Sequence, residues 1–464
     1  MPTIESRQDR SSPAPSTAST RPTRTRYWLI AFAIVLAVIQ YIDRVCISQA
    51  MPEIAHDLQL TDSQEGIIFS AFALAYALFE IPTGWLGDKI GARKVLVRVV
   101  LWWSFFTAAT GWAWNYVSLL VTRFLFGAGE AGCFPNLTKA FSAWLPAVER
   151  TRAQAIMWMG ARWGGALTPL LVVTVMAFVS WQQAFLVFAL LGVVWTAVFY
   201  FWFRDNPRDH KGFNAAELEL LKENEQNVQG HGDVPWRVLF SRPTSWLLWA
   251  QYFCSSYGWY FYITWLPKYL KSERGMEIKS NPLMNWLAGL LEGSMSPAMT
   301  VTVLAAALAG IPLLLGGFGS LTAGLISNRL LGRGVNVVKI RRTFAFVGFT
   351  GAAALLMTSY YIKDALLAML SMGMASFCND MVMPGSWSTC MDVGGKYAGT
   401  MSGSMNMMGN LGGVAGGYVV GKILEYTHRD WHLTFLIFAI TYFMGAICWA
   451  WIDPVTPLEK EKPK

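Results

Sequence analysis

Twelve apolar segments run through the sequence, and each is long enough to cross the hydrocarbon core of a bilayer as a helix, which takes roughly 20 residues. Inside that core every backbone polar group needs an internal partner, and a helix supplies all of its own. The sequence therefore predicts an all-α integral membrane protein surrounded by a lipid bilayer. The expected spans are approximately 27–50, 65–86, 94–113, 117–141, 152–179, 182–203, 245–268, 301–327, 342–361, 365–388, 396–424 and 431–452.

The small share of charged residues argues against an ordinary soluble domain. Only 14% of the residues are charged and 54% are hydrophobic, whereas soluble domains carry about a quarter charged residues. The net charge of +8 is compatible with nucleic-acid binding, but the basic residues lie between the apolar segments and in the tails. We therefore expect no nucleic-acid partner.

The spacing of the spans gives six spans, a polar gap and six further spans. Within the gap, Asn214 is followed three residues later by Glu217, a pattern typical of a helix start. Two six-helix halves are the layout of transporters built from repeats. The predicted parts are a disordered polar tail, 1–26, an N-terminal half, 27–203, a central loop, 204–244, a C-terminal half, 245–452, and a second tail, 453–464.

The distribution of basic residues predicts the orientation in the membrane. The N-terminal tail and the connections after the second and eighth spans are rich in Lys and Arg, whereas 51–64 has acids but neither basic residue. Because short loops rich in Lys and Arg stay in the cytoplasm, both termini are expected there. The connection 269–300 is an exception, since it carries Lys271, Arg274 and Lys279 on the expected outer side. The first 26 residues lack the apolar region and cleavage pattern of a signal peptide.

A glycine-rich segment, 84–94, joins the second and third spans. Its glycines permit close helix approach and a tight turn, and its aspartate can pair with the arginine or cap the next helix. A weaker copy at 319–329 has Asn in place of the Asp. The segment resembles the loop motif of the major facilitator superfamily, which implies two pseudo-symmetric six-helix halves. It also implies a structural or gating role for the connector residues, Gly84, Gly87, Asp88, Gly91 and Arg93.

Four ionisable residues lie inside the first and fourth spans, where charges are costly and mark functional sites. Asp43 and Arg44 are in the first span. In the fourth span, Arg123 and Glu130 are seven residues apart, which is close to two helical turns, so they share a face.

Two acids and two arginines suit a mechanism that couples the movement of protons to the movement of an anion. Arginine offers a fork of donors matched to a carboxylate, and a carboxylate shielded from water can change protonation in a working pH range. An acid that loses its proton competes with an anionic substrate for the arginine. The alternative is two static ion pairs that only stabilise the helix bundle.

These charges also carry a second resemblance. Tyr41-Ile-Asp-Arg and Arg123-x6-Glu, with the segments 204–207, 235–237 and 392–406, resemble the anion:cation symporter family, which includes hexuronate, galactonate and glucarate transporters. The resemblance implies alternating-access symport of a small organic anion, such as a sugar acid, with protons or sodium, in a bacterial inner membrane. By position, it makes Asp43 and Glu130 the proton-coupling acids, Arg44 and Arg123 the anion anchors, and Tyr41 and Asn406 hydrogen-bonding residues for the substrate.

Further polar or aromatic residues inside spans are candidates for the cavity. Arg162 in the fifth span could bind a second carboxylate or fix hydroxyl groups, or pair structurally with Asp380. Tyr76 could line the cavity or simply pack. The aromatic stretch 257–265 could stack on a substrate, although packing and an interfacial belt explain such clusters more often.

Three other functions compete with anion symport. A proton-driven drug antiporter would favour a cavity with acids and aromatic groups but few arginines, and a membrane sensor would need a signalling domain. An enzyme is not expected, because the sequence has no nucleophile elbow, phosphate loop or metal-spaced His/Cys set. We expect no cofactor, no metal and a monomer.

Overall fold

The computed structural model describes residues 21–224, 234, 236–266, 269, 282, 285–286, 289, 297–427 and 431–458. Within these ranges every regular element is a helix. The predictions that concern residues 1–20, most of the connection 269–300 and the tail beyond residue 458 lie outside the described residues.

The first half contains seven helices joined by short turns. Three of them begin with side-chain caps that satisfy free backbone N–H groups: Thr61 with Gln64, Asn115 with Ser118, and Ser180 with Gln183. The helices are α1 (Arg26–Leu58), α2 (Asp62–Ile90), α3 (Ala92–Thr110), α4 (Tyr116–Glu130), α5 (Cys133–Trp144), α6 (Ala147–Met176) and α7 (Trp181–Trp202).

The central loop holds short helices, and the second half follows it. The helix expected after Asn214 is α8 (Ala215–Glu219), whose Glu217 pairs with Arg26 at the start of α1. The other described elements of the central loop are η1 (Pro207–Asp209), η2 (Lys222–Asn224) and α10 (Trp236–Ser241). Among the described residues of the second half, the elements are α11 (Pro243–Thr264), α14 (Pro297–Gly332), α15 (Val337–Tyr361), α16 (Ala365–Asp380), α17 (Met383–Gly394), η4 (Gly395–Tyr397), α18 (Ala398–Tyr426) and α19 (His432–Trp451).

Long apolar helices account for the expected spans. In the described part of the chain, nine helical runs are long and apolar enough to cross a membrane, and one of them, 366–424, covers two expected spans. The other two expected spans coincide with α3, whose first turns carry Arg93, Lys94 and Arg98, and with α11, which is rich in Trp and Tyr. These polar and amphipathic groups lower the hydropathy of a helix without preventing it from spanning the membrane.

Two of the expected spans are broken, which corrects the prediction of continuous helices at 117–141 and 365–388. The fourth span divides into α4 and α5 around Gly132, which has a φ of +86°. The tenth divides into α16 and α17 at 381–382, and Pro384 lies in the first turn of α17. Broken helices expose backbone ends inside the membrane and are typical of transporter sites.

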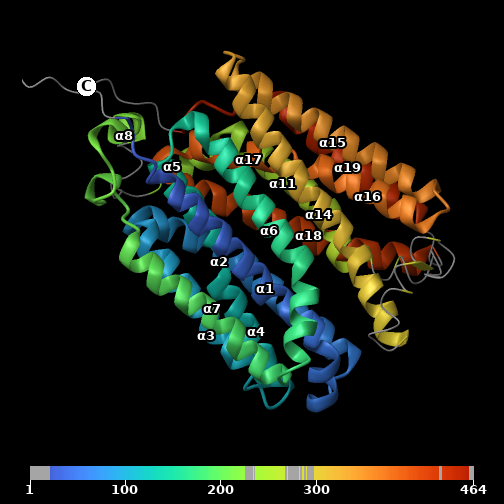
Figure 1. The fold of residues 1–464 in the computed structure, drawn as a ribbon. Coiled ribbons are helices and arrows are strands. Elements are labelled where there is room, and N and C mark those ends of the chain that lie inside the picture. Colours follow the sequence, from blue (N-terminus) through green and yellow to red (C-terminus); the bar gives the residue numbers. More distant parts are fainter. Residues whose placement is uncertain are drawn as a thin grey trace, which may run out of the picture.

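The halves meet most extensively along two helix pairs, α2 with α18 and α6 with α14, and α5 and α6 also contact α18 and α17. Figure 1 shows the blue-to-green helices of the first half on one side and the yellow-to-red helices of the second half on the other. The short helix α8 lies near the start of α1, at one end of the bundle. We call this the loop end.

Candidate functional site

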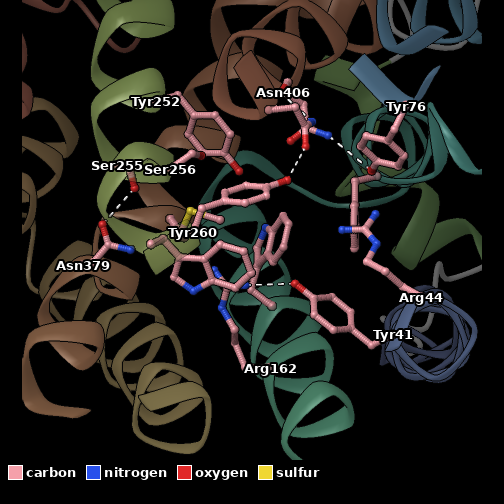
Figure 2. A pocket seen from close by; sticks show the side chains of 15 residues that line it. Tyr41, Arg44, Tyr76, Arg162, Tyr252, Ser255, Ser256, Tyr260, Asn379 and Asn406 are labelled. Atoms are coloured by element: carbon pink, nitrogen blue, oxygen red, sulfur yellow. Dashed lines mark hydrogen bonds between the residues drawn. The ribbon is translucent and has the colours of Figure 1, made fainter. Parts of the chain in front are cut away.

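A polar cavity lies between the two halves and encloses about 460 Å³ of space, including the part open to solvent. Its walls come from α1, α2, α5 and α6 of the first half and α11, α16, α17 and α18 of the second. Figure 2 shows many of these side chains directed toward one another. The lining residues are Tyr41, Arg44, Tyr76, Phe134, Trp158, Arg162, Tyr252, Ser255, Ser256, Trp259, Tyr260, Asn379, Met383, Asn406 and Asn410.

Arg44 forms one wall of the cavity and pairs with a buried acid. Its Nη2 and Nε donate to Oε1 of Glu130 at 2.6 and 3.0 Å, and Gln40 donates to the same oxygen at 2.8 Å. The guanidinium also lies over the rings of Tyr76, at 4.7 Å, and Phe72, at 5.3 Å. Glu130 itself is fully buried and is the last residue of α4.

Arg162 forms a second wall and makes a matching pair with the other half. Its Nε and Nη2 donate to the two carboxylate oxygens of Asp380 at 2.6 and 3.1 Å. Its Nη1 donates to the Tyr41 hydroxyl at 2.9 Å, a contact visible in Figure 2. Asp380 is the last residue of α16, so both cavity arginines bind an acid at the end of a broken helix. Arg162 therefore lines the cavity and is paired with Asp380, whereas its predicted contact with substrate stays a prediction.

Asp43 and Arg123 lie behind the cavity wall and do not line it. Asp43 is 1% exposed, and neither carboxylate oxygen has a hydrogen-bond partner among the described residues. The Arg123 guanidinium lies over the Phe126 ring at 4.1 Å, and its Nη1 likewise lacks a partner there. Neither residue therefore contacts this cavity in the described conformation, and their predicted roles, proton coupling for Asp43 and anion binding for Arg123, stay predictions.

The predicted polar residues Tyr41, Tyr76 and Asn406 do line the cavity. Sequence reasoning missed Asn410, which accepts a hydrogen bond from Tyr260 at 2.8 Å. It also missed Ser255, which donates to Asn379 at 2.9 Å. Neither has a local sequence signal, because a polar residue in a span can face any side of its helix.

Glu80 is a further acid that sequence reasoning missed. It lies in α2, is fully buried and accepts a hydrogen bond from Asn406 at 2.6 Å. The sequence contained evidence for it, because Glu80 is a carboxylate inside the expected span 65–86 and ionisable residues within spans mark functional sites.

The connector motif closes the loop end by binding the second half. Asp88 accepts hydrogen bonds from the backbone N–H groups of Gly399 and Thr400, at 3.0 and 2.6 Å, and from the Thr400 hydroxyl at 2.6 Å. Lys139 lies 3.6 Å from the same carboxylate. Asp88 thus contacts the start of α18, and it does not pair with Arg93.

The glycines of the motif make room for these contacts. A Cβ on Gly84 would lie 2.4 Å from the carbonyl oxygen of Gly399, and one on Gly87 would lie 1.7 Å from the Asn136 side chain. Gly91 has a φ of +95° at the turn into α3. This motif therefore allows α2 and α18 to touch backbone to backbone.

Arg93 joins α3 to the start of the central loop. Its side chain donates to the carbonyl oxygen of Tyr200, and its backbone N–H donates to Asp205 at 2.9 Å. Burial raises the pKa of Asp205, an effect that the bond from Arg93 opposes.

A second bridge between the halves also lies at the loop end. Asp392 accepts from Arg150 of the first half and from Arg341 of the second, each at 2.6 Å. Arg150 also donates to Asn224 of η2 at 2.8 Å. Asp88 and Asp392 together hold the halves closed at this end.

Most of the chain matches a known protein family. Residues 33–417 match the family model described as Major Facilitator Superfamily. The chain belongs to the major facilitator superfamily. It is therefore a multi-pass membrane transporter and not an enzyme, and the predicted fold, all α with two pseudo-symmetric six-helix halves, is confirmed.

Two superfamily relatives match nearly end to end. A probable sulfoacetate transporter of Cupriavidus necator is 34% identical over 95% of this chain and 97% of its own length. A probable galactarate/D-glucarate transporter of Escherichia coli strain K12 is 30% identical over 92% of this chain and 94% of its own. Among solved structures, the proton:xylose symporter matches with a TM-score of 0.71 at 12% identity, covering 93% of this chain and 97% of that one. At that identity the likeness concerns the fold alone.

Proposed function

We propose that this transporter is a proton-coupled symporter of a small organic anion with an anionic group at each end. The observation that carries the proposal is the pairing of both cavity arginines, Arg44 and Arg162, with acids at the ends of broken helices. The two relatives described above are probable transporters of sulfoacetate and of galactarate/D-glucarate, and each of these anions has an anionic group at both ends.

Protonation and anion binding are linked because they use the same arginines. A helix C-terminus carries a partial negative charge, which disfavours a carboxylate there. Glu130 and Asp380 both occupy such positions, and each is bound to a cavity arginine. A protonated acid releases its arginine, which can then bind the carboxylate or sulfonate of the substrate through two parallel hydrogen bonds.

The rest of the cavity suits a polar substrate that carries hydroxyl groups. Tyr41, Tyr76, Asn406 and Asn410 supply hydrogen-bonding groups that can read hydroxyls. A hydrophobic cation would gain nothing from two arginines in the wall, so the geometry favours an anion over a drug-like substrate.

The transport cycle requires the closed loop end to open. We place the loop end in the cytoplasm of a bacterial cell, because the basic connections gather there. With the loop end bridged by Asp88 and Asp392, this conformation corresponds to the state that receives substrate and protons from outside. Separation of α2 from α18 would then release both inside.

The deciding experiment is uptake by proteoliposomes with an inward proton gradient. Labelled glucarate, galactarate and sulfoacetate should accumulate, and a protonophore should abolish accumulation. Substituting sodium for potassium outside, without a proton gradient, tests sodium coupling. Accumulation driven by sodium alone would replace the proton in the proposal, and efflux of hydrophobic cations without anion uptake would contradict it.

The variant Glu130→Gln identifies the coupling acid. Glutamine cannot ionise, so proton-driven accumulation should be lost while exchange of labelled for unlabelled anion across the membrane partly remains. The control is Glu219→Gln in α8, an exposed acid whose partner is Lys222. Full, pH-dependent accumulation by Glu130→Gln would remove this residue from the coupling mechanism.

A further inference from the structure

Glu80 is a buried acid that the proposed mechanism does not yet use. It lies in α2, one helical turn after the cavity residue Tyr76, and its relative exposure is 0%. Its Oε1 accepts a hydrogen bond from Asn406 at 2.6 Å. Its Oε2 has no hydrogen-bond partner among the described residues, and none of those residues forms an ion pair with it.

An ionised carboxylate is poorly accommodated in this position. A buried charge without a cation partner or a full set of donors is expensive, and such a group takes up a proton instead. Glu130 has Arg44, and Asp380 has Arg162, whereas Glu80 has only neutral hydrogen-bonding neighbours, the Asn406 amide and the Tyr76 hydroxyl. Glu80 is therefore suited to hold a proton in this conformation.

Glu80 interacts electrostatically with other ionisable groups around the cavity. The charged ones are Arg44 of α1 and Glu130 of α4. The neutral titratable ones are Tyr76, Cys133 and Tyr260. If Glu80 ionises, its charge attracts the Arg44 guanidinium, which is bound to Glu130 here. A proton on Glu80 therefore affects how firmly Arg44 is held on Glu130.

The bond to Asn406 also crosses the boundary between the halves. Asn406 belongs to α18, and its Nδ2 lies 3.5 Å from the Tyr76 hydroxyl as well as 2.6 Å from Glu80. At the same level the helix backbones touch, because a Cβ on Gly403 would lie 2.8 Å from the Glu80 carbonyl oxygen. The Glu80 carboxyl is thus placed at a contact that must break when the loop end opens.

We propose that Glu80 is an additional proton-binding group of the transport cycle, which holds a proton while α2 and α18 are in contact and releases it when they separate. The proposal rests on the proposed proton-coupled symport. It makes the number of protons carried per anion larger by one than the acids of the proposed mechanism alone would give.

The test is the proton-to-anion ratio of native protein and Glu80→Gln in proteoliposomes. Glutamine matches the protonated acid in shape and still accepts the bond from Asn406, so anion exchange should stay close to the native rate. The ratio should fall by one, and anion accumulation at equilibrium should fall by about tenfold for each pH unit of gradient. The matched control, Glu53→Gln on the exposed surface of α1, should keep the native ratio.

Two outcomes separate this inference from the function on which it rests. If native protein does not accumulate anions in response to a proton gradient, the symport proposal fails. If native protein does so and Glu80→Gln has the same ratio and the same pH profile, only the role of Glu80 is overturned.

Infrared difference spectroscopy decides the matter if Glu80→Gln is inactive in transport. Native protein should show the C=O stretch of a protonated carboxyl group that disappears when substrate release is triggered, and this band should be missing in Glu80→Gln. A band that is unchanged in the variant would overturn the proposal.

Discussion

At the scale of single residues, Glu130 and Asp380 occupy corresponding positions in the two halves. Each is the last residue before the break in a divided helix, each is fully buried, and each binds an arginine that lines the cavity. The pairs differ in one respect. Arg44 and Glu130 lie in the same half, whereas Arg162 reaches Asp380 in the other half. The second pair is therefore a direct link between the two halves at the cavity.

Arg162→Gln should weaken binding of substrates with two anionic groups more than binding of monoanions. A hydrogen bond to a charged group contributes about 1.5–3 kcal/mol, so kcat/KM for glucarate should fall roughly ten- to 150-fold. Uptake kinetics with glucarate and with a monoanionic aldonate measure the difference. The matched control is Arg152→Gln, an exposed arginine on the same helix. Equal kcat/KM values for glucarate in both variants would exclude Arg162 from substrate binding.

Arg162→Gln removes the ion-pair partner of Asp380 as well as the proposed contact with substrate, so the two effects must be separated. Breaking a buried ion pair on one side costs roughly 3–5 kcal/mol of stability, so Arg162→Gln should also lower the thermal unfolding temperature in detergent. The double variant Arg162→Gln with Asp380→Asn should recover much of the stability but not the uptake of glucarate. Recovery of both properties would make the role of Arg162 structural.

Residue types in the spans predicted much of the site, and packing determined the rest. Five residues were predicted as cavity residues because each is a polar or aromatic group in an expected span. All five line the cavity: Tyr41, Arg44, Tyr76, Arg162 and Asn406. Arg123 carried the same signal but points into an aromatic environment behind the wall, and only the rotation of α4 in the bundle decides that. The sequence identifies the residues that are costly to bury, but it does not predict which side of each helix faces the cavity.

At the scale of elements, the break in the fourth span is what places Glu130 at a helix end. The break depends on Gly132, whose φ of +86° suits glycine and disfavours other residues. A Cβ at this position would also lie 2.4 Å from Thr83 Cγ2. Length and hydropathy could not predict the break, because Gly127, Gly129 and Gly132 look alike in sequence and only Gly132 has a positive φ.

Gly132→Ala should destabilise the protein by roughly 1–3 kcal/mol, the cost of holding a non-glycine residue in such a conformation. Apparent unfolding temperature in detergent measures this. Gly417→Ala in α18 is the control, since nothing lies within 4 Å of the added Cβ and the residue is in a helix. An unfolding temperature for Gly132→Ala equal to that of the control would mean that the chain relaxes around this position at no cost.

At the scale of the whole molecule, the two halves are bridged at the loop end by Asp88 and Asp392, and at the cavity by the pair of Arg162 with Asp380. The twelve spans and the two halves follow from the sequence, because span length is set by bilayer thickness and needs no knowledge of packing. The ion pairs and hydrogen bonds that bridge the halves cannot be predicted from the sequence in this way. Asp392 lies 242 residues from Arg150 in sequence, and no local pattern pairs them. The state in which the molecule is seen, closed at the loop end, is therefore a property of the assembled structure alone.

Asp392→Asn should shift the molecule toward the state that is open at the loop end. The carboxylate bridges Arg150 and Arg341, and its replacement removes the negative charge that holds two arginines from opposite halves together. A loss of about 1.5 kcal/mol changes the equilibrium between the two states roughly tenfold. Hydrogen–deuterium exchange should then increase at 398–403, where α18 contacts α2 through Asp88 and Gly84.

The control for this shift lies at the opposite end of the same half. Asp364 caps the start of α16, and asparagine is an equally good cap, so Asp364→Asn should leave exchange at 398–403 unchanged. Asp392→Asn should also slow accumulation from outside while speeding release to the inside, because the state that receives substrate becomes less populated. If exchange at 398–403 did not rise, the contacts of Asp88 alone would be sufficient to keep the loop end closed, and Asp392 would have no part in gating.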